Sequence, residues 1–436
     1  MDGGRLRWSG AVRQGAPGSR ATRLELFYDL VFVYAFLTVT TLTSTEPTVR
    51  NLIACLLVLA LLWWCWTGFA GLGNRVRTDQ GVLPVVGFVT VTATFLLALS
   101  TPGAFVDRPG GLNGPVFFAG CYLVVRASQL AVFGWVAWSD PAERRRWLRL
   151  TLLPVTATAL LVVAALVPQR LATGAGQGWL RLGLWIAALL VEYVAGTAWG
   201  WSYWVVVSAG HWAERHALIV LVALGESIIA LGFGPKFIRE LPLTWPVVAA
   251  AGFGIAVASA LWWAYFDTLA LAVEQALHRT REPVARARLA RDAYTWLHLP
   301  MIAGIIFFAL GLKDLLAEVA DPATPARGVP LGGFWVPVLH GGVAVYLLAL
   351  AGLGWRALGA VRWAPLAAVA VLAALSPVTA RVPELDALAL LAVVCVVSTV
   401  AQTVVDGPRR RRIRQVALDE QLAFELEQSR WRGEHL

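Results

Sequence analysis

The chain has 436 residues, of which 58% are hydrophobic and 14% are charged, and its mean hydropathy is +0.66. A membrane-spanning helix needs about 20 mainly apolar residues, and many such runs occur here, so the composition excludes a soluble globular protein and indicates an integral membrane protein. The net charge of +9 does not indicate nucleic-acid binding. Most of the arginines lie in alternate loops between apolar runs, which is typical of cytoplasmic loops.

The chain begins with a basic leader, residues 1–23, that lacks an apolar core, so we expect a cytoplasmic segment rather than a cleavable signal peptide. The apolar runs that follow predict an all-α, polytopic protein with about twelve membrane-spanning helices. An even number of spans places both termini in the cytoplasm. The predicted spans are 24–43, 49–71, 81–100, 114–138, 149–168, 179–199, 216–234, 244–270, 291–316, 334–355, 362–381 and 385–404.

The two halves of the chain share short stretches in the same order, which predicts two six-helix repeats, 24–199 and 200–404. A unit with an even number of spans repeats in the same orientation, so the repeats would be parallel. Chance similarity between apolar helices is the alternative. The aligned stretches are Phe27–Val33 with Leu224–Ala230, Ala60–Trp66 with Ser259–Tyr265, and Leu83-Pro84 with Leu299-Pro300.

The segment 405–436 differs from the rest of the chain because charged residues dominate it. Its first part carries four consecutive arginines, which favour contact with anionic lipids of the inner leaflet. After them, apolar residues alternate loosely with acids, and this pattern predicts an amphipathic cytoplasmic helix. The arginines are Arg409, Arg410, Arg411 and Arg412.

Ionisable residues inside the predicted spans are the main candidates for function. A carboxylate at the centre of a bilayer costs about 2.5–3.5 kcal/mol on insertion scales, so it needs a partner, a proton or a role. Glu25 and Asp29 are four residues apart, which places both on one face of a helix. The candidates for an ion or substrate pathway are Glu25, Asp29, Arg126, Glu192, Glu226 and His298.

These candidates contain more acids than bases, and the excess is costly in hydrocarbon. In one interpretation the acids are protonated or bonded within the protein and serve structure only. In the other they line a polar pathway for protons, cations or a cationic substrate. In that case we expect Asp29 and Glu226 to occupy equivalent positions in the two repeats and to face a central cavity, with Arg126 as their counter-ion.

A second group of polar residues is predicted near the inner interface. His211, Glu214 and Arg215 can share one helical face, and Asp267 closes the eighth predicted span. The group lacks the two histidines, four residues apart, of a zinc-binding helix. The chain also lacks a phosphate-binding glycine loop and a nucleophile elbow. We therefore predict no metal, no cofactor and no catalytic residue.

Several of these stretches together resemble the bacterial low temperature requirement A (LtrA) family. The resemblance covers roughly residues 20–315 and implies a polytopic protein of the bacterial inner membrane. It implies no defined reaction, since the family name describes growth in the cold. The matching stretches are Leu24–Val33, Glu214-Arg215-His216, Leu224–Ile228, Trp262–Asp267 and Leu297–Gly304.

The sequence leaves three functions open. The leading hypothesis is a secondary transporter or proton-coupled carrier, because carriers place buried charged residues at the interface of repeats. A cation channel is the second, and Phe27-Tyr28-Asp29 is also similar to the first-helix motif of endosomal, lysosomal and bacterial potassium channels built from six-helix repeats. The third is a membrane enzyme that acts on lipid, or a scaffold in envelope stress adaptation. The small ion or small molecule that would be transported is not predicted.

Overall fold

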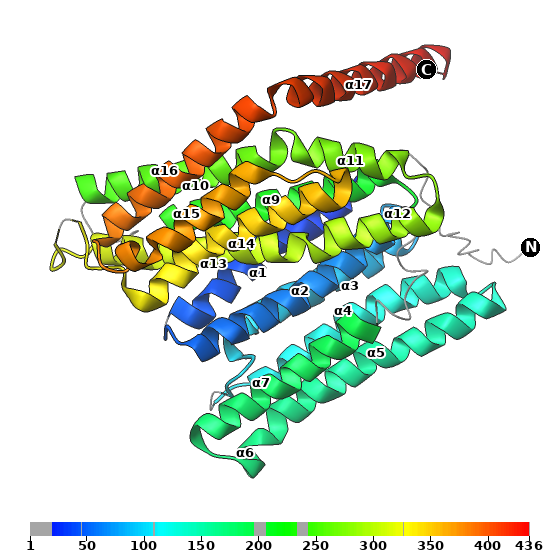
Figure 1. The fold of residues 1–436 in the computed structure, drawn as a ribbon. Coiled ribbons are helices and arrows are strands. Elements are labelled where there is room, and N and C mark those ends of the chain that lie inside the picture. The colour runs from blue at the N-terminus through cyan, green and yellow to red at the C-terminus, as the bar shows by residue number, and fades with distance from the viewer. Residues whose placement is uncertain are drawn as a thin grey trace, which may run out of the picture. The chain divides into compact units, whose positions relative to one another are not determined.

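The computed structural model describes residues 20–44, 46–107, 110–195, 206–232, 243–325 and 327–435, and the named elements in these ranges are all helices (Figure 1). Most of the predicted basic leader, residues 1–19, lies outside the described residues. The chain forms two compact units. The first contains Met1–Ala223 and Glu282–Arg291, and the second contains Leu224–Arg281 and Asp292–Leu436. Their boundary falls inside helix α9 (Ala209–Gly232).

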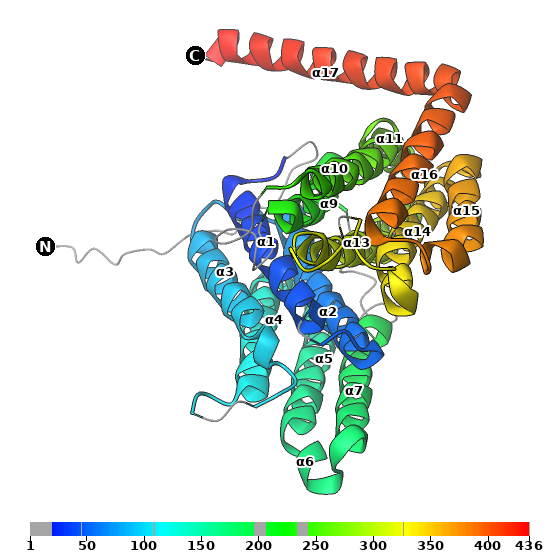
Figure 2. The same ribbon diagram turned by 90° about the vertical axis from the view of Figure 1, so that its left-hand side faces the viewer.

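The first unit is a bundle of long helices in which α1 packs on α2 and α3, and α4, α5 and α7 run side by side (Figure 2). Short helical segments join or extend the long ones. The long helices are α1 (Arg23–Ser44), α2 (Val49–Arg75), α3 (Leu83–Leu99), α4 (Gly114–Ala137), α5 (Pro141–Leu166) and α7 (Gly174–Leu190), and the short ones are η1 (Thr101–Gly103), α6 (Pro168–Leu171), η2 (Val191–Ala195) and α12 (Pro283–Leu289).

Local sequence explains where several of these helices begin. The side chains of Thr48, Asn113 and Asp140 accept hydrogen bonds from backbone N–H groups of the first turns of α2, α4 and α5. Such caps satisfy donors that have no partner inside the helix. Pro115 and Pro141 stand in the first turns of α4 and α5, where the missing N–H of proline costs nothing.

The second unit contains the remaining long helices, of which α13 and α14 pack most closely. A Cβ added at Gly304 of α13 would lie 2.5 Å from the carbonyl oxygen of Gly342 in α14, so glycine allows the two backbones to meet. The segment η4 (Ala290–Trp296) crosses the boundary between the units. The helices are α10 (Trp245–Phe266), α11 (Leu269–Arg279), α13 (His298–Val319), α14 (Gly332–Leu358), α15 (Trp363–Thr379), α16 (Glu384–Val405) and α17 (Gly407–His435).

The helices identify a multi-pass membrane protein. Within the described ranges, nine helices are long and apolar enough to cross a bilayer, and α3 and α15 are shorter apolar helices. Each of the twelve predicted ranges overlaps a helix. Because only nine meet the criteria of length and composition, the number of twelve spans and the cytoplasmic position of both termini stay predictions. The six-helix repeats also stay a prediction, since compact units are not by themselves evidence of duplication.

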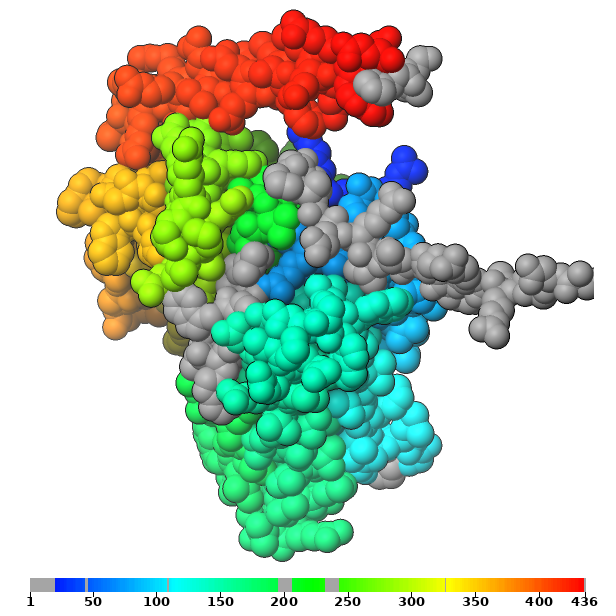
Figure 3. All heavy atoms as spheres, turned by 90° about the vertical axis from the view of Figure 1, so that its right-hand side faces the viewer, coloured from blue at the N-terminus to red at the C-terminus, as the bar shows by residue number. Residues whose placement is uncertain are grey.

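The predicted amphipathic tail forms helix α17. Its atoms, red in Figure 3, lie at the surface of the second unit. Large apolar side chains on this helix are exposed, including Leu418, Leu426 and Trp431.

Candidate functional site

The deepest polar group of the first unit lies between α1 and α9 and is called here the Asp29 cluster. It consists of Glu25 and Asp29 from α1 and His211 and Arg215 from α9. None of these residues is more than 3% exposed. The four-residue spacing within each pair places both members on one face of their helix, as predicted for the two acids.

Glu25 is surrounded by donors on both carboxylate oxygens. Its Oε1 forms an ion pair with Arg215 Nη1 (3.0 Å) and lies 3.0 Å from His211 Nε2. Its Oε2 accepts hydrogen bonds from the backbone N–H and the hydroxyl of Thr22, at 2.7 and 2.9 Å. The chain makes room for this carboxylate with Gly73, where an added Cβ would lie 1.5 Å from Oε1.

Asp29 is bonded through one oxygen only. Its Oδ1 accepts hydrogen bonds from Trp66 Nε1 (2.7 Å) and from Arg215 Nη2 (2.7 Å). Its Oδ2 is buried and has no hydrogen-bond partner among the described residues. The Arg215 guanidinium also lies over the rings of Trp66 and Phe69 at 5.6 and 5.8 Å, a cation–π arrangement that helps to hold a buried charge.

The hydrogen bonds of Asn74 fix the protonation of His211. Asn74 Oδ1 accepts from the backbone N–H of Val207 (2.7 Å), so the other amide atom is the NH2 group, which donates to Ser208 O (2.7 Å). That NH2 group also lies 3.2 Å from His211 Nδ1. A protonated Nδ1 would place two donors against each other. The network therefore assigns the neutral tautomer, in which Nε2–H donates to Glu25.

A second polar group lies on another face of α2 and joins Arg126 of α4 to Glu192 of η2. The guanidinium donates from Nε and Nη2 to the two oxygens of Glu192, at 3.3 and 3.1 Å. Trp64 Nε1 donates to Glu192 Oε2 (2.8 Å), and the Tyr122 hydroxyl donates to Oε1. Four donors fill the acceptor sites of this carboxylate, so Glu192 is held as a fully bonded anion.

The Arg126 side chain is also fixed on its other side. Its Nη1 donates to Gln129 Oε1 (2.7 Å), and Gln129 Nε2 donates to the carbonyl of Cys65 in α2 (2.7 Å). Gly68 provides the space, because a Cβ there would lie 2.4 Å from Gln129 Oε1. Glu192 lies in a turn of π-helix, a geometry that is frequent at functional sites.

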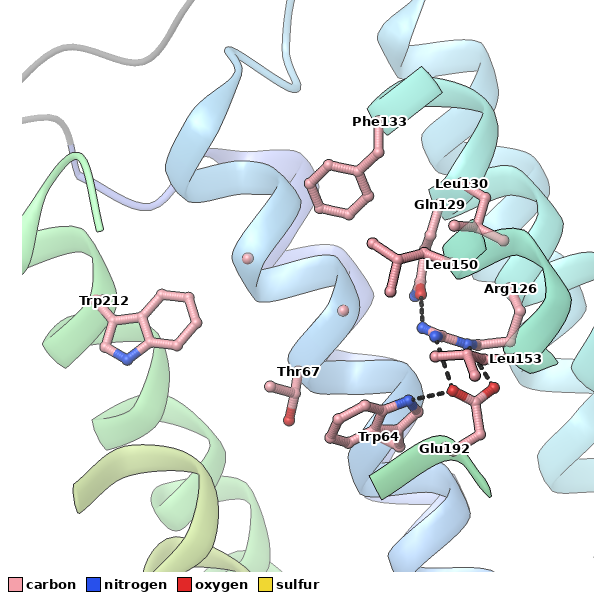
Figure 4. A pocket seen from close by; sticks show the side chains of 12 residues that line it. Trp64, Thr67, Arg126, Gln129, Leu130, Phe133, Leu150, Leu153, Glu192 and Trp212 are labelled. Atoms are coloured by element: carbon pink, nitrogen blue, oxygen red, sulfur yellow. Dashed lines mark hydrogen bonds and ion pairs between the residues drawn. The ribbon is translucent and has the colours of Figure 1, made fainter. Parts of the chain in front are cut away.

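A cavity of about 70 Å³ adjoins this ion pair (Figure 4). One face of α2 forms a wall, since Trp64, Thr67, Gly68 and Gly71 follow the i, i+3, i+4, i+7 spacing of a helical face. The other walls come from α4, α5, η2 and α9. Those side chains are Arg126, Gln129, Leu130, Phe133, Leu150, Leu153, Glu192 and Trp212.

The structure corrects one predicted pairing. Arg126 was expected to be the counter-ion of Asp29, but its carboxylate partner is Glu192. Arg215 is the cation that pairs with Asp29. Glu226 is buried in the second unit, and the expectation that it faces Asp29 of the first unit stays a prediction.

The residues predicted near the inner interface take different roles. His211 and Arg215 belong to the Asp29 cluster, whereas Glu214 accepts a hydrogen bond from the backbone of Ala21 (3.0 Å). Asp267 belongs to the second unit, where Arg410 donates to both of its oxygens (2.7 and 2.8 Å) and Arg414 bonds to one of them.

His298 also lies in the second unit, and its environment fixes its tautomer. Its Nδ1 donates to the carbonyl of Ala293 (2.9 Å), and its Nε2 faces the hydroxyl of Tyr265 (2.9 Å). Among the described residues, no group of three or more His, Cys, Asp or Glu side chains is placed to hold a metal ion.

Sequence reasoning missed the tryptophans that bond to the buried acids. Trp64 and Trp66 lie in the stretch Trp63-Trp64-Cys65-Trp66 of α2, and each donates an indole N–H to a different carboxylate. Two indoles that are two positions apart in the sequence point to different faces of a helix. The sequence did contain a signal for them. A tryptophan within a membrane span needs a hydrogen-bond partner for its indole N–H, and the acids predicted in other spans needed donors.

The fold and these buried charges define a multi-pass helical membrane protein. The sequence model of the family described as bacterial low temperature requirement A protein (LtrA) matches residues 20–400. The chain therefore belongs to that family. It is also 27% identical over 319 residues to an uncharacterized protein of Rhizobium meliloti (strain 1021), covering 70% of this chain and 72% of that protein. No solved structure matches the chain.

Proposed function

We propose that this protein is a proton-coupled secondary transporter of the bacterial inner membrane, in which Asp29 carries the proton. One observation supports the proposal. The buried Asp29 cluster contains two carboxylates, one guanidinium and an imidazole that its hydrogen bonds hold neutral. Its formal charge is therefore −1, and one bound proton makes it neutral. An uncompensated charge within a membrane is costly, so uptake and release of that proton is the chemistry for which the cluster is suited.

Hydrogen bonding favours Asp29 over the other groups as the proton carrier. Glu25 has donors at both oxygens, which stabilise its anion. His211 already lies between the NH2 group of Asn74 at Nδ1 (3.2 Å) and the carboxylate of Glu25 at Nε2 (3.0 Å). Asp29 Oδ2 is the carboxylate oxygen of the cluster that lacks a hydrogen bond within the described ranges.

Protonation of Asp29 would also change how the side chains of the first unit link α1 to α9. Arg215 of α9 bridges Glu25 and Asp29 of α1 (3.0 and 2.7 Å). When Asp29 is neutral, the ion pair at one end of this bridge becomes a hydrogen bond from the guanidinium to an uncharged carboxyl group, which is weaker than the ion pair. A transporter needs such a link between a bound proton and the position of a helix.

Proton flux into proteoliposomes, followed with an entrapped pH-sensitive dye, tests the proposal. We expect Asp29→Asn to reduce the flux to the level of empty liposomes while the protein keeps its thermal unfolding temperature, because asparagine preserves shape and removes the titrating group. Asp79→Asn, in the exposed loop after α2, is the control and should not change the flux. Wild-type flux in a protein carrying both Asp29→Asn and Glu226→Gln would refute the proposal.

The same preparation distinguishes the other candidate functions. Discrete unitary currents in planar bilayers would indicate a cation channel instead of a carrier. A lipid-modifying enzyme needs catalytic side chains that substrate can reach, whereas His211 and Arg215 are 1% and 0% exposed. Burial therefore favours the transport proposal over that alternative.

We also propose that α17 contacts anionic lipids of the inner leaflet through Arg409, Arg411 and Arg412. These side chains are exposed, and juxtamembrane arginines gain about 1 kcal/mol each near an anionic surface. Phosphatidylglycerol nanodiscs should raise the unfolding temperature above that in phosphatidylcholine, and replacing the three arginines with glutamine should remove the difference. Replacing Arg430 and Arg432 on the same helix is the control. An undiminished lipid effect in the triple variant would refute this contact.

A further inference from the structure

Another cavity of the first unit, with a volume of about 830 Å³, lies where α1 ends and where α2 and α7 begin. Residues of η1, of α6 and of the loop after η1 complete its walls. Sites for small molecules have volumes of about 300–1,000 Å³. If both termini are cytoplasmic, as the sequence predicts, α1 ends at the outer face of the membrane, and this cavity is open to solutes from that side.

Arg181 of α7 borders this cavity and has no counter-ion. Its Nε donates to the carbonyl of Ala164 (3.0 Å), and its Nη1 donates to the carbonyl of Phe105. Both acceptors are uncharged, and three of the five N–H hydrogens remain available. Arg181 is partly buried, and α7 is among the helices that are long and apolar enough to cross a bilayer. An arginine within such a helix typically faces a water-filled cavity on a substrate or ion pathway.

A second guanidinium, that of Arg50 in the first turn of α2, lies against the same helix. A Cβ added at Gly178 of α7 would lie 3.0 Å from Arg50 Nη1 and 3.8 Å from its Cζ. Gly178 and Arg181 are three residues apart, so they are neighbours on one face of α7. Within the described ranges, the ion pairs include neither Arg50 nor Arg181. Two unpaired cations therefore border one cavity from the same side.

The start of α7 adds positive potential to this cavity. Its N-cap residue Thr173 makes no side-chain hydrogen bond to the helix, and the first turn holds no acidic residue. The free N–H groups and the partial positive charge of such an N-terminus favour an anion. Two acids, Glu46 and Asp107, also border the cavity, but both are exposed, and Asn113 already donates to Asp107 (2.9 Å). Solvent therefore screens these acids more than it screens the partly buried Arg181.

We infer that this cavity binds an oxyanion, the carboxylate or phosphate group of a small water-soluble molecule, through Arg50 and Arg181. Guanidinium groups donate strong, charge-assisted hydrogen bonds to both kinds of anion. The side-chain amides of Asn51 and Gln177 on the same walls can bond to hydroxyl groups of the ligand. The inference rests on the proposed function only in taking this molecule as the substrate of the carrier, because binding can be measured alone.

Saturation-transfer NMR of the purified full-length protein in detergent tests the charge of the ligand. The probes are lactate and glycerol 3-phosphate as oxyanions, glycerol as an uncharged polyol, and choline as a cation. We expect both oxyanions to bind, and glycerol and choline to bind at least tenfold more weakly or not at all. Choline or glycerol binding with the affinity of the oxyanions would overturn the assignment.

Three arginine substitutions locate the ligand. Arg50→Gln removes an exposed guanidinium, so the protein should fold and should lose at least tenfold in affinity for both oxyanions. Arg181→Gln should have a similar effect, although it also removes two bonds to backbone carbonyls. Arg170→Gln is the matched control, because Arg170 is an exposed residue of α6 that does not border the cavity. Unchanged affinity in Arg50→Gln, or an equal loss in Arg170→Gln, would overturn the site.

The source of the oxyanion can be tested on the same samples, because a phospholipid headgroup carries the same chemistry. Native mass spectrometry should show no difference in retained phosphatidylglycerol between the wild type and Arg50→Gln. Retention that is lost in Arg50→Gln would identify a lipid headgroup as the occupant and overturn the water-soluble ligand.

The outcomes also separate this inference from the proposed function. A wild-type protein that binds neither oxyanion, yet shows proton flux that depends on Asp29, would overturn the ligand assignment and leave the transport proposal intact. A protein that binds lactate through Arg50 but carries no proton flux would refute the transport proposal and leave the oxyanion site intact.

Discussion

The two buried charge groups of the first unit pack against different faces of the same helix, α2, and differ in how completely they are bonded. In the Arg126–Glu192 pair one guanidinium meets one carboxylate, and four donors fill the acceptor sites of Glu192. In the Asp29 cluster one guanidinium serves two carboxylates, and one oxygen of Asp29 has no hydrogen bond within the described residues. The first group has no net charge, whereas the second has a formal charge of −1 and would become neutral on binding one proton.

The degree of hydrogen bonding distinguishes a carboxylate with a structural role from one that can react more clearly than burial does. Both groups are buried, and a buried ion pair is by itself weak evidence for either stability or function. A carboxylate with every acceptor site filled has no place for another proton or cation, so Glu192 orients Arg126 beside the cavity. A carboxylate with a bare oxygen in a cluster of net negative charge can exchange a proton. Matched substitutions, one in each charge group, can test whether the two groups differ in this way.

The largest effect is expected from removing the shared cation. Arg215→Gln leaves two buried carboxylates without their guanidinium, which should destabilise the protein by about 3–5 kcal/mol. Arg126→Gln should cost less, because Trp64 and Tyr122 still donate to Glu192. Thermal unfolding in detergent, followed by size-exclusion fluorescence, ranks the two variants. Adding Asp29→Asn to Arg215→Gln should recover part of the loss. An equal cost for both arginines would contradict the proposed difference.

The next effect comes from the space that glycine leaves for a carboxylate. Gly73→Ala places a Cβ 1.5 Å from Glu25 Oε1, so the carboxylate must move away from Arg215 and His211. We expect a loss of about 1–3 kcal/mol, the usual cost of overpacking, together with reduced proton flux. Gly225→Ala is a helical control with no neighbour within 4 Å and should be neutral or stabilising. Unaltered stability of the Gly73 variant would show that Glu25 does not depend on this contact.

Much of the architecture could be predicted from the sequence, because apolar runs of spanning length require helices in a membrane. Each of the twelve predicted ranges overlaps a helix, and the four-residue spacing of Glu25 and Asp29 placed both on one face. The partners of the acids could not be predicted in the same way. Arg215 lies 186 residues from Asp29 in the sequence, and only the tertiary fold brings the two side chains together.

The environment of Arg215 was predicted wrongly because the residue lies at the start of an apolar helix. A charged stretch at the start of an apolar helix normally indicates a solvated interface, yet Arg215 is fully buried. Its neighbour Glu214 fits the expectation better, since it is only partly buried. Because Arg215 had been counted outside the span, the sequence analysis overstated the excess of buried acids over buried bases.

An effect of similar size should follow from removing one indole N–H from each group. Trp66→Phe and Trp64→Phe each delete one hydrogen bond to a carboxylate (2.7 and 2.8 Å), which should cost about 1.5–3 kcal/mol. Only Trp66→Phe should move the pH at half-maximal proton flux. Its N–H favours the anion of Asp29, so its loss should move that midpoint to higher pH. A shift caused by Trp64→Phe, or none with Trp66→Phe, would argue against Asp29 as the proton carrier.

The smallest effect is expected at the exposed pair that follows α2. The Arg77 guanidinium donates to Asp79 (3.0 Å) and holds the pKa of this carboxyl below its usual value. Both side chains are more than a third exposed, so solvent screens the pair and Asp79→Asn should cost less than about 1 kcal/mol. Because the folded pKa is lowered, the contribution is present above about pH 4, the usual range of an aspartate, and fades as the pH falls through the lowered value. Unfolding temperatures of the wild type and the variant should therefore differ slightly at pH 7, converge once the pH has fallen below the lowered pKa, and converge at pH 7 in high salt. A difference that persists in high salt would mean that Asp79 interacts with more than Arg77.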